Sequence, residues 1–176
     1  MNHDRYDDAY IAAILDEVKT IAMVGASANN VRPSYFVAKY LLAKGYRVVP
    51  VNPGLAGTLI LGQRVYGRLA DVPAPVDMVD IFRNSEAARE VTREAIASRE
   101  RLAIRAVWMQ LGVRDAAAAE QAEAAGLRVV MNRCPKIEYG RLSGEIGWMG
   151  VNAGRVSSRR PLLGAGVQNQ RIAPKT

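Results

Sequence analysis

The sequence is poor in the residues that most often build metal sites and covalent active sites. It holds one cysteine, Cys134, and one histidine, His3. A single cysteine excludes an internal disulfide, and one cysteine with one histidine excludes a structural zinc site. No serine has a histidine base within the predicted folded region, and neither HExxH nor GxxxxGK[ST] occurs. We therefore expect no metal site and no set of catalytic residues.

Long hydrophobic runs are also missing. No stretch approaches the roughly 18 uncharged apolar residues of a membrane-spanning helix, and the acidic start MNHDRYDDAY lacks the layout of a signal peptide. We expect a cytoplasmic protein. With 176 residues, 49% of them hydrophobic, the chain is long enough for one core.

Acidic residues are absent from the last part of the chain. The net charge is +7, and residues 151–176 contribute five basic side chains to it: Arg155, Arg159, Arg160, Arg171 and Lys175. This segment is either a solvated, partly disordered tail or a surface for nucleic acid, an acidic partner or a neighbouring subunit. We predict a folded domain over 1–142 and a basic, partly disordered tail over 143–176.

Five apolar runs rich in β-branched residues alternate with helical segments. The runs cover 20–24, 47–53, 77–82, 104–110 and 127–131, and the helices about 7–18, 33–44, 85–98 and 115–125. Ser85 and Asp115 are the expected N-caps of the last two helices. The alternation predicts an α/β protein: a Rossmann-like, doubly wound parallel sheet of about five strands, with helices on both faces.

In such a sheet a ligand binds beyond the carboxyl ends of the strands, where the strand order reverses, normally between the first and the fourth strand. The rule selects four loops, Gly25 to Pro33, Asn52 to Gly57, Phe82 to Asn84 and Met109 to Val113. Residues 54–73 form a long, irregular, glycine-punctuated excursion. We expect this excursion to be functional or to cover a ligand.

The first loop has the pattern of a phosphate cradle. Gly25 and Ser27 follow an apolar strand, and Pro33 opens a helix, so unpaired amides and the helix dipole converge there. Arg32 and Ser34 add a cation and a hydroxyl. An ordinary tight turn remains the alternative. The spacing is not the GxGxxG of dinucleotide-binding proteins, so NAD is not the default ligand.

The second and third loops offer groups that suit a nucleotide. Asn52 and Pro53 fix a turn that could border an adenine or a ribose, or simply bend the chain. Phe82 and Arg83 could stack on a base or pair with a phosphate. Alternatively, Asp80 holds Arg83 in a surface ion pair.

The fourth loop places Gln110 close to Gly112, which would let the backbone approach a ligand; Trp108 is more often a core residue. Cys134 is the one candidate nucleophile. Arg133 and Lys136 would lower its pKa and favour the thiolate, whereas the alternative is a small hydrophobic residue buried after the last strand.

Several long strings in this sequence carry a family resemblance. VGAS, RPSYFVAKYLLAKGYRVVPVNP, LGQRVYGRLADVP, VDMVDIFRNSEAA, VWMQLGV and AGLRVVMNRCPKIEYGRL occur in this order across about 10–142. In order and spacing they resemble the small stand-alone bacterial CoA-binding domain proteins of the YccU type. That group is similar to the CoA-binding N-terminal domain of the succinyl-CoA synthetase α subunit.

The resemblance implies that coenzyme A or an acyl-CoA lies across the carboxyl edge of the sheet. The implied contact residues are Gly25, Ala26, Ser27, Ala28, Arg32, Ser34, Val51, Asn52, Pro53, Phe82, Arg83, Trp108, Met109 and Gln110. It also implies that Cys134 lies near the thiol end of CoA, where a mixed disulfide could form under oxidation.

The sequence departs from relatives at two points. A lysine that often follows the proline of the second loop is replaced by Gly54, so Arg64 or Arg32 would have to substitute. The synthetase's phosphohistidine and grasp domains have no counterpart, so ligase activity does not carry over. We expect a non-catalytic CoA sensor, carrier or partner module. The alternatives are an NAD(P)-dependent oxidoreductase on the same fold and a nucleic-acid or interaction module acting through the tail.

Overall fold

The computed structural model describes residues 1–145. Residues 146–176, which include nearly all of the predicted basic tail, lie outside this part. Within the described residues, no helix is both long and apolar enough to cross a bilayer.

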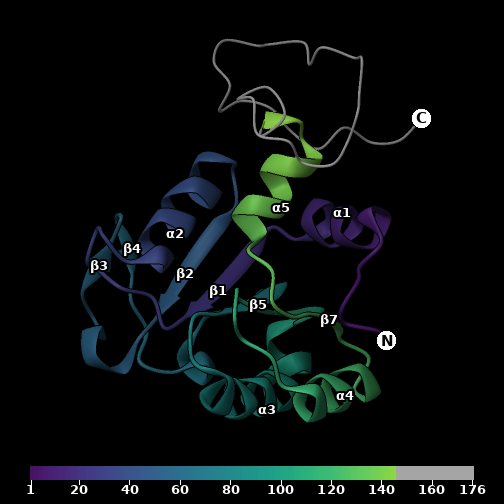
Figure 1. Cartoon of the computed structure of the whole chain (residues 1–176). Helices are drawn as coiled ribbons and strands as arrows, with labels where there is room; N and C mark the ends of the chain where they lie inside the picture. Colours follow the sequence, from purple (N-terminus) through teal and green to yellow (C-terminus); the bar gives the residue numbers. More distant parts are fainter. Residues whose placement is uncertain (146–176) are drawn as a thin grey trace.

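A five-stranded parallel sheet forms the centre of the molecule (Figure 1). Its strands, in chain order, are β1 (Thr20–Val24), β2 (Arg47–Val51), β5 (Met78–Ile81), β6 (Ala106–Met109) and β7 (Arg128–Val130). Their spatial order is β2-β1-β5-β6-β7. Most strand residues are buried, as expected for a parallel sheet covered on both faces. The predicted fold class is confirmed.

Helices cover both faces of the sheet (Figure 1). The helices α1 (Asp8–Glu17), α2 (Pro33–Ala43) and α5 (Pro135–Leu142) pack on one face, and α3 (Ser85–Leu102) and α4 (Ala116–Ala124) pack on the other. Alternate residues of each strand enter the two cores. On β5, Met78 faces the first group of helices, while Val79 and Ile81 face the second.

The strand order corrects the position expected for the ligand. The order reverses between β1 and β5, the first and third strands of the main sheet, and not between the first and fourth. After β2 the chain returns past β1 and forms β5 on its other side. The crevice therefore lies between the first and third strands of the main sheet. The loops that flank it are those after β1 and β5.

Two local predictions were also wrong. The N-cap of α3 is Asn84, whose Oδ1 accepts from the Ala87 amide at 2.9 Å, and the Ser85 hydroxyl instead accepts from the Arg114 amide at 3.0 Å. The helix α5 was missed, although Pro135 at its first position is a helix-start signal.

The excursion over 54–73 is more regular than predicted. It contains an antiparallel hairpin, β3 (Leu59–Ile60) and β4 (Gln63–Arg64), between two short 3-10 helices, Pro53–Leu55 and Leu69–Asp71. Buried Ile60, Val65 and Leu69 attach it to the body of the domain. The Tyr66 amide donates to the Pro50 carbonyl at 2.9 Å, and the Tyr66 carbonyl accepts from the Asn52 amide at 2.8 Å, so the excursion lies beside the end of β2.

At the opposite edge, Asp77 joins the beginnings of three strands. Its Oδ2 accepts from the amides of Lys19 and Thr20 at 2.9 and 2.8 Å, and its Oδ1 accepts from Arg105 at 2.5 Å. Burial acts to raise the pKa of Asp77, but the hydrogen bonds from Arg105, Thr20 and Lys19 outweigh it, and the pKa lies below its ordinary value. The folded state therefore favours the charged carboxylate.

Replacing this carboxylate should destabilise the fold. We expect Asp77→Asn to lower the free energy of unfolding by about 1–3 kcal/mol, because one buried and one partly buried amide lose a charged acceptor. Since the folded pKa is lowered, the difference from wild type should be full above about pH 4 and should shrink as the pH falls further. Urea unfolding at pH 7, 5 and 3 measures it.

The matched control is Asp71→Asn, because Asp71 pairs with Arg68 on an exposed surface. It should move the urea midpoint far less. If Asp77→Asn lowers the free energy of unfolding by the same amount at every pH, the stabilising role of the charged Asp77 carboxylate is contradicted.

Candidate functional site

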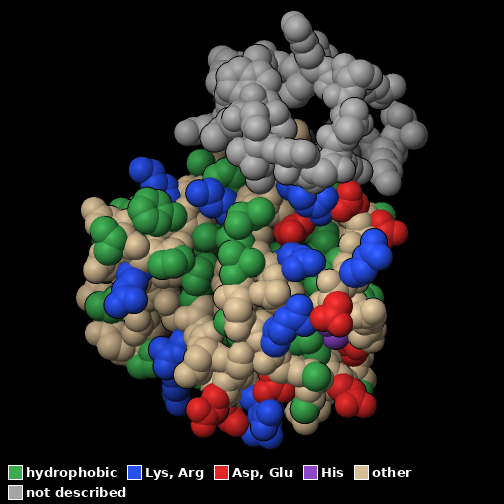
Figure 2. All heavy atoms as spheres, viewed as in Figure 1, with side chains coloured by type: hydrophobic (Ala, Val, Ile, Leu, Met, Phe, Trp, Pro, Cys, Tyr) green, Lys and Arg blue, Asp and Glu red, His purple; other side chains and the backbone are tan. Residues whose placement is uncertain are grey.

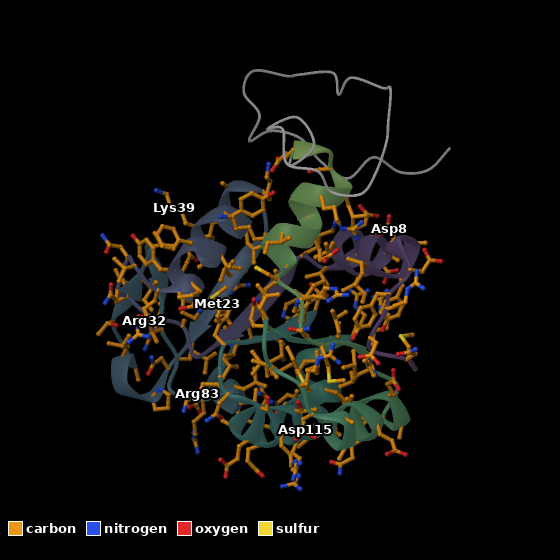
Figure 3. The ribbon with its side chains drawn as sticks, in the orientation of Figure 1. Asp8, Met23, Arg32, Lys39, Arg83 and Asp115 are labelled. Carbon is orange, nitrogen blue, oxygen red and sulfur yellow. The ribbon has the colours of Figure 1, made fainter. Side chains whose placement is uncertain are left out.

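A cavity of about 540 Å³ lies at the carboxyl edge of the sheet, next to the switch point. It is lined by residues from α2, α3, the loops after β5 and β6, and the residue directly before α5: Pro33, Val37, Phe82, Arg83, Asn84, Ala87, Gln110, Leu111, Val113 and Cys134. Figure 3 shows Arg32 and Arg83 on the side of the molecule where β1 and β2 end. Residues of the first, third and fourth predicted loops therefore line this cavity, whereas none of the second loop does.

Gly25 allows the first and third loops to touch. Its φ is +89°, and a Cβ at this position would lie 2.3 Å from the Phe82 carbonyl oxygen and 2.9 Å from Arg83 Cδ. The Phe82 amide in turn donates to the Val24 carbonyl at 2.8 Å. No residue with a side chain fits here, so glycine is required both for its backbone angles and for the close approach.

Asn52 fastens the second loop to the first. Its Nδ2 donates to the Ala26 carbonyl at 2.8 Å, and its Oδ1 accepts from the Gly54 amide at 2.9 Å. The Gly25 amide donates to the Val51 carbonyl at 2.9 Å. Both ends of the Asn52 amide are thus used within the protein, and the first turn is held on two sides.

The first turn contains backbone amides that donate to no group in the described residues. Within residues 1–145 the amides of Ala26, Ser27 and Ala28 have no protein acceptor, whereas the Ser27 hydroxyl accepts from the Asn29 amide at 3.1 Å. Arg32 occupies the N-cap position of α2 without a capping side-chain hydrogen bond. Free amides and a helix N-terminus favour an anion.

The predicted site residues separate into three groups. One group lies in the first two loops and does not line the cavity: Gly25, Ala26, Ser27, Ala28, Arg32, Asn52 and Pro53. The side chains of Phe82, Arg83 and Gln110 line the cavity. Those of Val51, Trp108 and Met109 are buried in the two cores instead, and Ser34 is buried at the start of α2. Their predicted ligand contacts stay predictions.

Asp80 lies beneath the cavity and does not pair with Arg83 as a surface ion pair. Its side chain is 0% exposed, its Oδ1 accepts from Gln110 Nε2 at 2.8 Å, and its Oδ2 has no hydrogen-bond partner in the described part of the chain. Desolvation raises the pKa of Asp80 to about 7, against the lowering effect of the Gln110 hydrogen bond. The predicted ion pair does not form, because the Asp80 side chain is buried on the face of the sheet that α1, α2 and α5 cover.

Cys134 forms part of the cavity wall and is 6% exposed. Burial, its largest cause, raises the pKa of the thiol above its ordinary value, and the nearby Asp80 carboxylate raises it further. The prediction that Arg133 and Lys136 would favour the thiolate was wrong, because desolvation exceeds the effect of Lys136, and Arg133 pairs with Glu138 at 3.6 Å.

Apolar cavity residues were missed by the sequence analysis. Val37, Ala87, Leu111 and Val113 were read as helix or loop residues without a site role, and nothing in their local pattern marks them. Figure 2 shows hydrophobic side chains gathered over α2 and toward α5, with Lys and Arg among them. The exposed hydrophobic residues include Phe36, Leu111 and Ile137.

A second, smaller cavity of about 230 Å³ lies near the amino ends of β1 and β2, away from the predicted site. Its walls include Leu15, Lys44, Tyr46 and Tyr139. Lys44 forms a buried ion pair with Glu145 there and lies over the rings of Tyr40 and Tyr139. The cation is thus already used in packing α2 against the end of the described chain.

Known proteins resemble this chain over most of its described length. The uncharacterized protein YneT of Bacillus subtilis (strain 168) is 31% identical over 131 residues, which are 74% of this chain and 93% of YneT. Two solved structures are similar as well. Prb, the PH1109 protein redesigned for binding, has 38% identity and a TM-score of 0.73, covering 80% of this chain and 94% of its own. The cell-free ID.343 protein from Thermus thermophilus has 36% identity and a TM-score of 0.70, covering 76% and 96%.

The sequence model of one family, the CoA binding domain, matches residues 19–140. This range begins just before β1 and ends within α5, so it includes every strand of the sheet and all the loops around the larger cavity. The chain therefore belongs to the CoA binding domain family.

Proposed function

We propose that this protein binds coenzyme A or an acyl-CoA in the crevice at the carboxyl edge of the sheet, as a non-catalytic sensor, carrier or partner module. The observation that carries the proposal is the composition of this crevice. Two arginines, Arg32 and Arg83, lie at this edge, and the cavity beside them has largely apolar walls that include the Cys134 thiol. Coenzyme A has the same order of parts, with phosphates, a long pantetheine arm and a terminal sulfur.

The outer edge suits the phosphates. The free amides of Ala26, Ser27 and Ala28 lie beside the N-terminus of α2, and Arg32 and Arg83 are exposed at the same edge. Helix N-termini and guanidinium groups both favour phosphate oxygens. Arg64, exposed on β4, is our candidate to replace the lysine missing at Gly54.

The inner cavity suits the pantetheine arm. Pro33, Val37, Leu111 and Val113 supply apolar walls, and Gln110 supplies one polar group. A cavity with mostly apolar walls and a few polar groups is typical of small-molecule and cofactor sites. The arm would run toward Cys134.

The same geometry disfavours NAD(P). Dinucleotide-binding sheets place an acidic residue after the second strand to hold the ribose hydroxyls. Here that position is Asn52, whose amide is occupied by Ala26 and Gly54. An oxidoreductase would also need a group for hydride chemistry, which the sequence does not suggest.

Isothermal titration with CoA, acetyl-CoA, NAD and NADP tests the proposal directly. We expect CoA or acetyl-CoA to bind most tightly, because only these ligands match both the phosphate-binding edge and the apolar cavity. Tighter binding of either dinucleotide than of any CoA species would overturn the assignment.

Gly25→Ala should weaken CoA binding by about tenfold or more, because the added methyl group forces the Phe82 carbonyl away and opens the crevice. The matched control is Gly45→Ala. Gly45 also has a positive φ, +90°, but a Cβ there meets no atom within 4 Å. Both variants place alanine at a positive φ, but only Gly25→Ala also creates a steric clash, so only this variant should lower the affinity for CoA. Equal affinities of the two variants in titration calorimetry would contradict CoA binding in this crevice.

Arg83→Ala should weaken CoA binding by about tenfold or more, because a charged hydrogen bond to a phosphate contributes about 1.5–3 kcal/mol. Arg93→Ala, which removes an exposed arginine paired with Glu90 on α3, is the control and should bind as wild type. The loss should also diminish at high salt. If Arg83→Ala binds CoA within twofold of the wild-type affinity, Arg83 does not bind the CoA phosphates.

A further inference from the structure

The N-terminal segment, residues 3–10, lies outside the range 19–140 that the family model matches. It runs along β7, an edge strand of the main sheet, and into the first turn of α1 (Figure 1). Membership of the family therefore does not explain this segment. Its contacts lead, step by step, to one wall of the larger cavity.

Tyr10 binds the open edge of β7. The Arg128 amide donates to the Arg105 carbonyl toward β6 at 2.9 Å, so the polar groups of Val129, one residue later, face the outer edge. Tyr10 Oη accepts from the Val129 amide at 3.0 Å and donates to the Val129 carbonyl at 3.2 Å. One hydroxyl group thus takes the place of a neighbouring strand.

Tyr6 extends this contact beyond the end of the strand. The pairing of β6 with β7 ends at Val130. The next amide, that of Met131, donates to Tyr6 Oη at 2.7 Å. The rings of Tyr6 and Tyr10 stack, with centroids 6.0 Å apart and an interplanar angle of 8°. Tyr6 therefore holds the chain at the point where it leaves the sheet.

Tyr6 is linked to α4 through His3. Because the Tyr6 oxygen accepts from an amide, its hydrogen is free to donate to His3 Nδ1, 2.8 Å away. This direction places the proton of the neutral imidazole on Nε2, which lies 3.4 Å from Glu123 Oε1. Burial, the largest cause, lowers the pKa of His3 below its ordinary value, which favours the neutral ring that this arrangement needs.

The chain that follows β7, residues 131–134, leads to the cavity. Asn132 Oδ1 accepts from the Gly112 amide at 2.8 Å, and the Asn132 amide donates to the Val113 carbonyl at 3.2 Å. Val113 and Cys134 line the cavity. This segment and the loop after β6 thus form one hydrogen-bonded wall.

Two further contacts join the wall to the N-terminal segment. The guanidinium of Arg133 lies over the Tyr6 ring, 5.7 Å from its centroid. Asp4 Oδ1 accepts from the Arg114 guanidinium at 2.9 Å. On the side of the sheet, the Arg133 carbonyl accepts from the Trp108 indole at 2.8 Å. The wall is therefore held between the sheet and the N-terminal segment.

We propose that residues 3–10 position this wall for ligand binding, with Tyr6 and Tyr10 as the positioning residues. Neither tyrosine lines the cavity, and each acts through the backbone of residues 129–134. The inference rests on the proposed function, because it concerns the affinity of the same crevice for coenzyme A.

The physical reason is preorganisation. A wall made of two loop segments loses conformational entropy when it becomes ordered, and a ligand that has to order it binds more weakly. Contacts within the protein that order the wall beforehand remove this cost. If the Met131 amide loses its acceptor, a smaller fraction of molecules holds the binding-competent wall, and the measured affinity falls by that fraction.

Tyr6→Phe tests the proposal, because it removes the hydroxyl group and keeps the ring. In the protein without ligand, we expect the amides of Gly112, Met131 and Asn132 to exchange with solvent about fivefold faster or more, whereas the amides of β2 keep their rates. Titration calorimetry should show CoA binding that is about three- to tenfold weaker, as expected for the loss of one hydrogen bond.

Tyr46→Phe is the matched control. The Tyr46 hydroxyl donates to the Leu15 carbonyl at 2.6 Å, beside the smaller cavity at the amino ends of β1 and β2. This variant also loses a tyrosine hydrogen bond to the backbone, and urea unfolding should show its lower stability. It should keep the wild-type exchange rates at the wall and the wild-type affinity for CoA.

The indole N–H signal of Trp108 reports on the wall, because this group donates to the Arg133 carbonyl. The signal should shift in the proton–nitrogen correlation spectrum of Tyr6→Phe and stay in place in Tyr46→Phe. The chain has two tryptophans, so Trp148→Phe assigns the signal. A merely structural role of Tyr6 would leave this signal unmoved and would overturn the assignment.

Wild-type affinity for CoA in Tyr6→Phe would overturn this inference alone, whatever the exchange rates show. Absence of CoA binding by the wild-type protein would overturn the proposed function and this inference with it. Should Tyr6→Phe not fold, Tyr10→Phe decides, because losing the Val129 contacts should loosen the same wall. Wild-type affinity in Tyr10→Phe then contradicts the proposal.

Discussion

The close contact between Gly25 and the Phe82 carbonyl is the constraint on which the site depends. It brings the turn after β1 against the loop after β5 at the point where the strand order reverses. Asn52 then ties the second loop to the same turn. Three segments far apart in the sequence are thereby fixed around one edge of the sheet. Rigid placement of this kind lets a binding site hold a flexible ligand without paying again for loop ordering.

The crevice combines two environments that require different physics. At its outer edge Arg32 and Arg83 are exposed to solvent, so they attract an anion in a way that salt weakens. At its inner end Asp80 and Cys134 are buried, and desolvation dominates both pKa values. The pKa of the Asp80 carboxyl group is raised to about 7, and the raised pKa of the Cys134 thiol favours its protonated form.

Much of the fold could be predicted from local pattern. The β-branched runs and the capping signals gave the strands and four of the helices within a few residues, because these elements depend on nearby side chains. Prediction failed where distant groups compete. Ser85 was expected to cap α3, but Asn84 takes the amide while the Ser85 hydroxyl binds the Arg114 amide. Asp80 was expected to pair with Arg83 at the surface, but the pleat of β5 turns it into the core.

The sequence by itself determined the alternating α/β architecture, the glycine turn after the first strand and the family resemblance, because hydrophobic period, turn residues and long strings are local properties. Only the tertiary structure decided that the order reverses between β1 and β5, that apolar residues such as Val37 and Leu111 line the cavity, and that one oxygen of Asp80 is buried without a partner among the described residues. These features arise from strand order and from which face each side chain occupies. They join residues tens of positions apart, whose proximity no local pattern records.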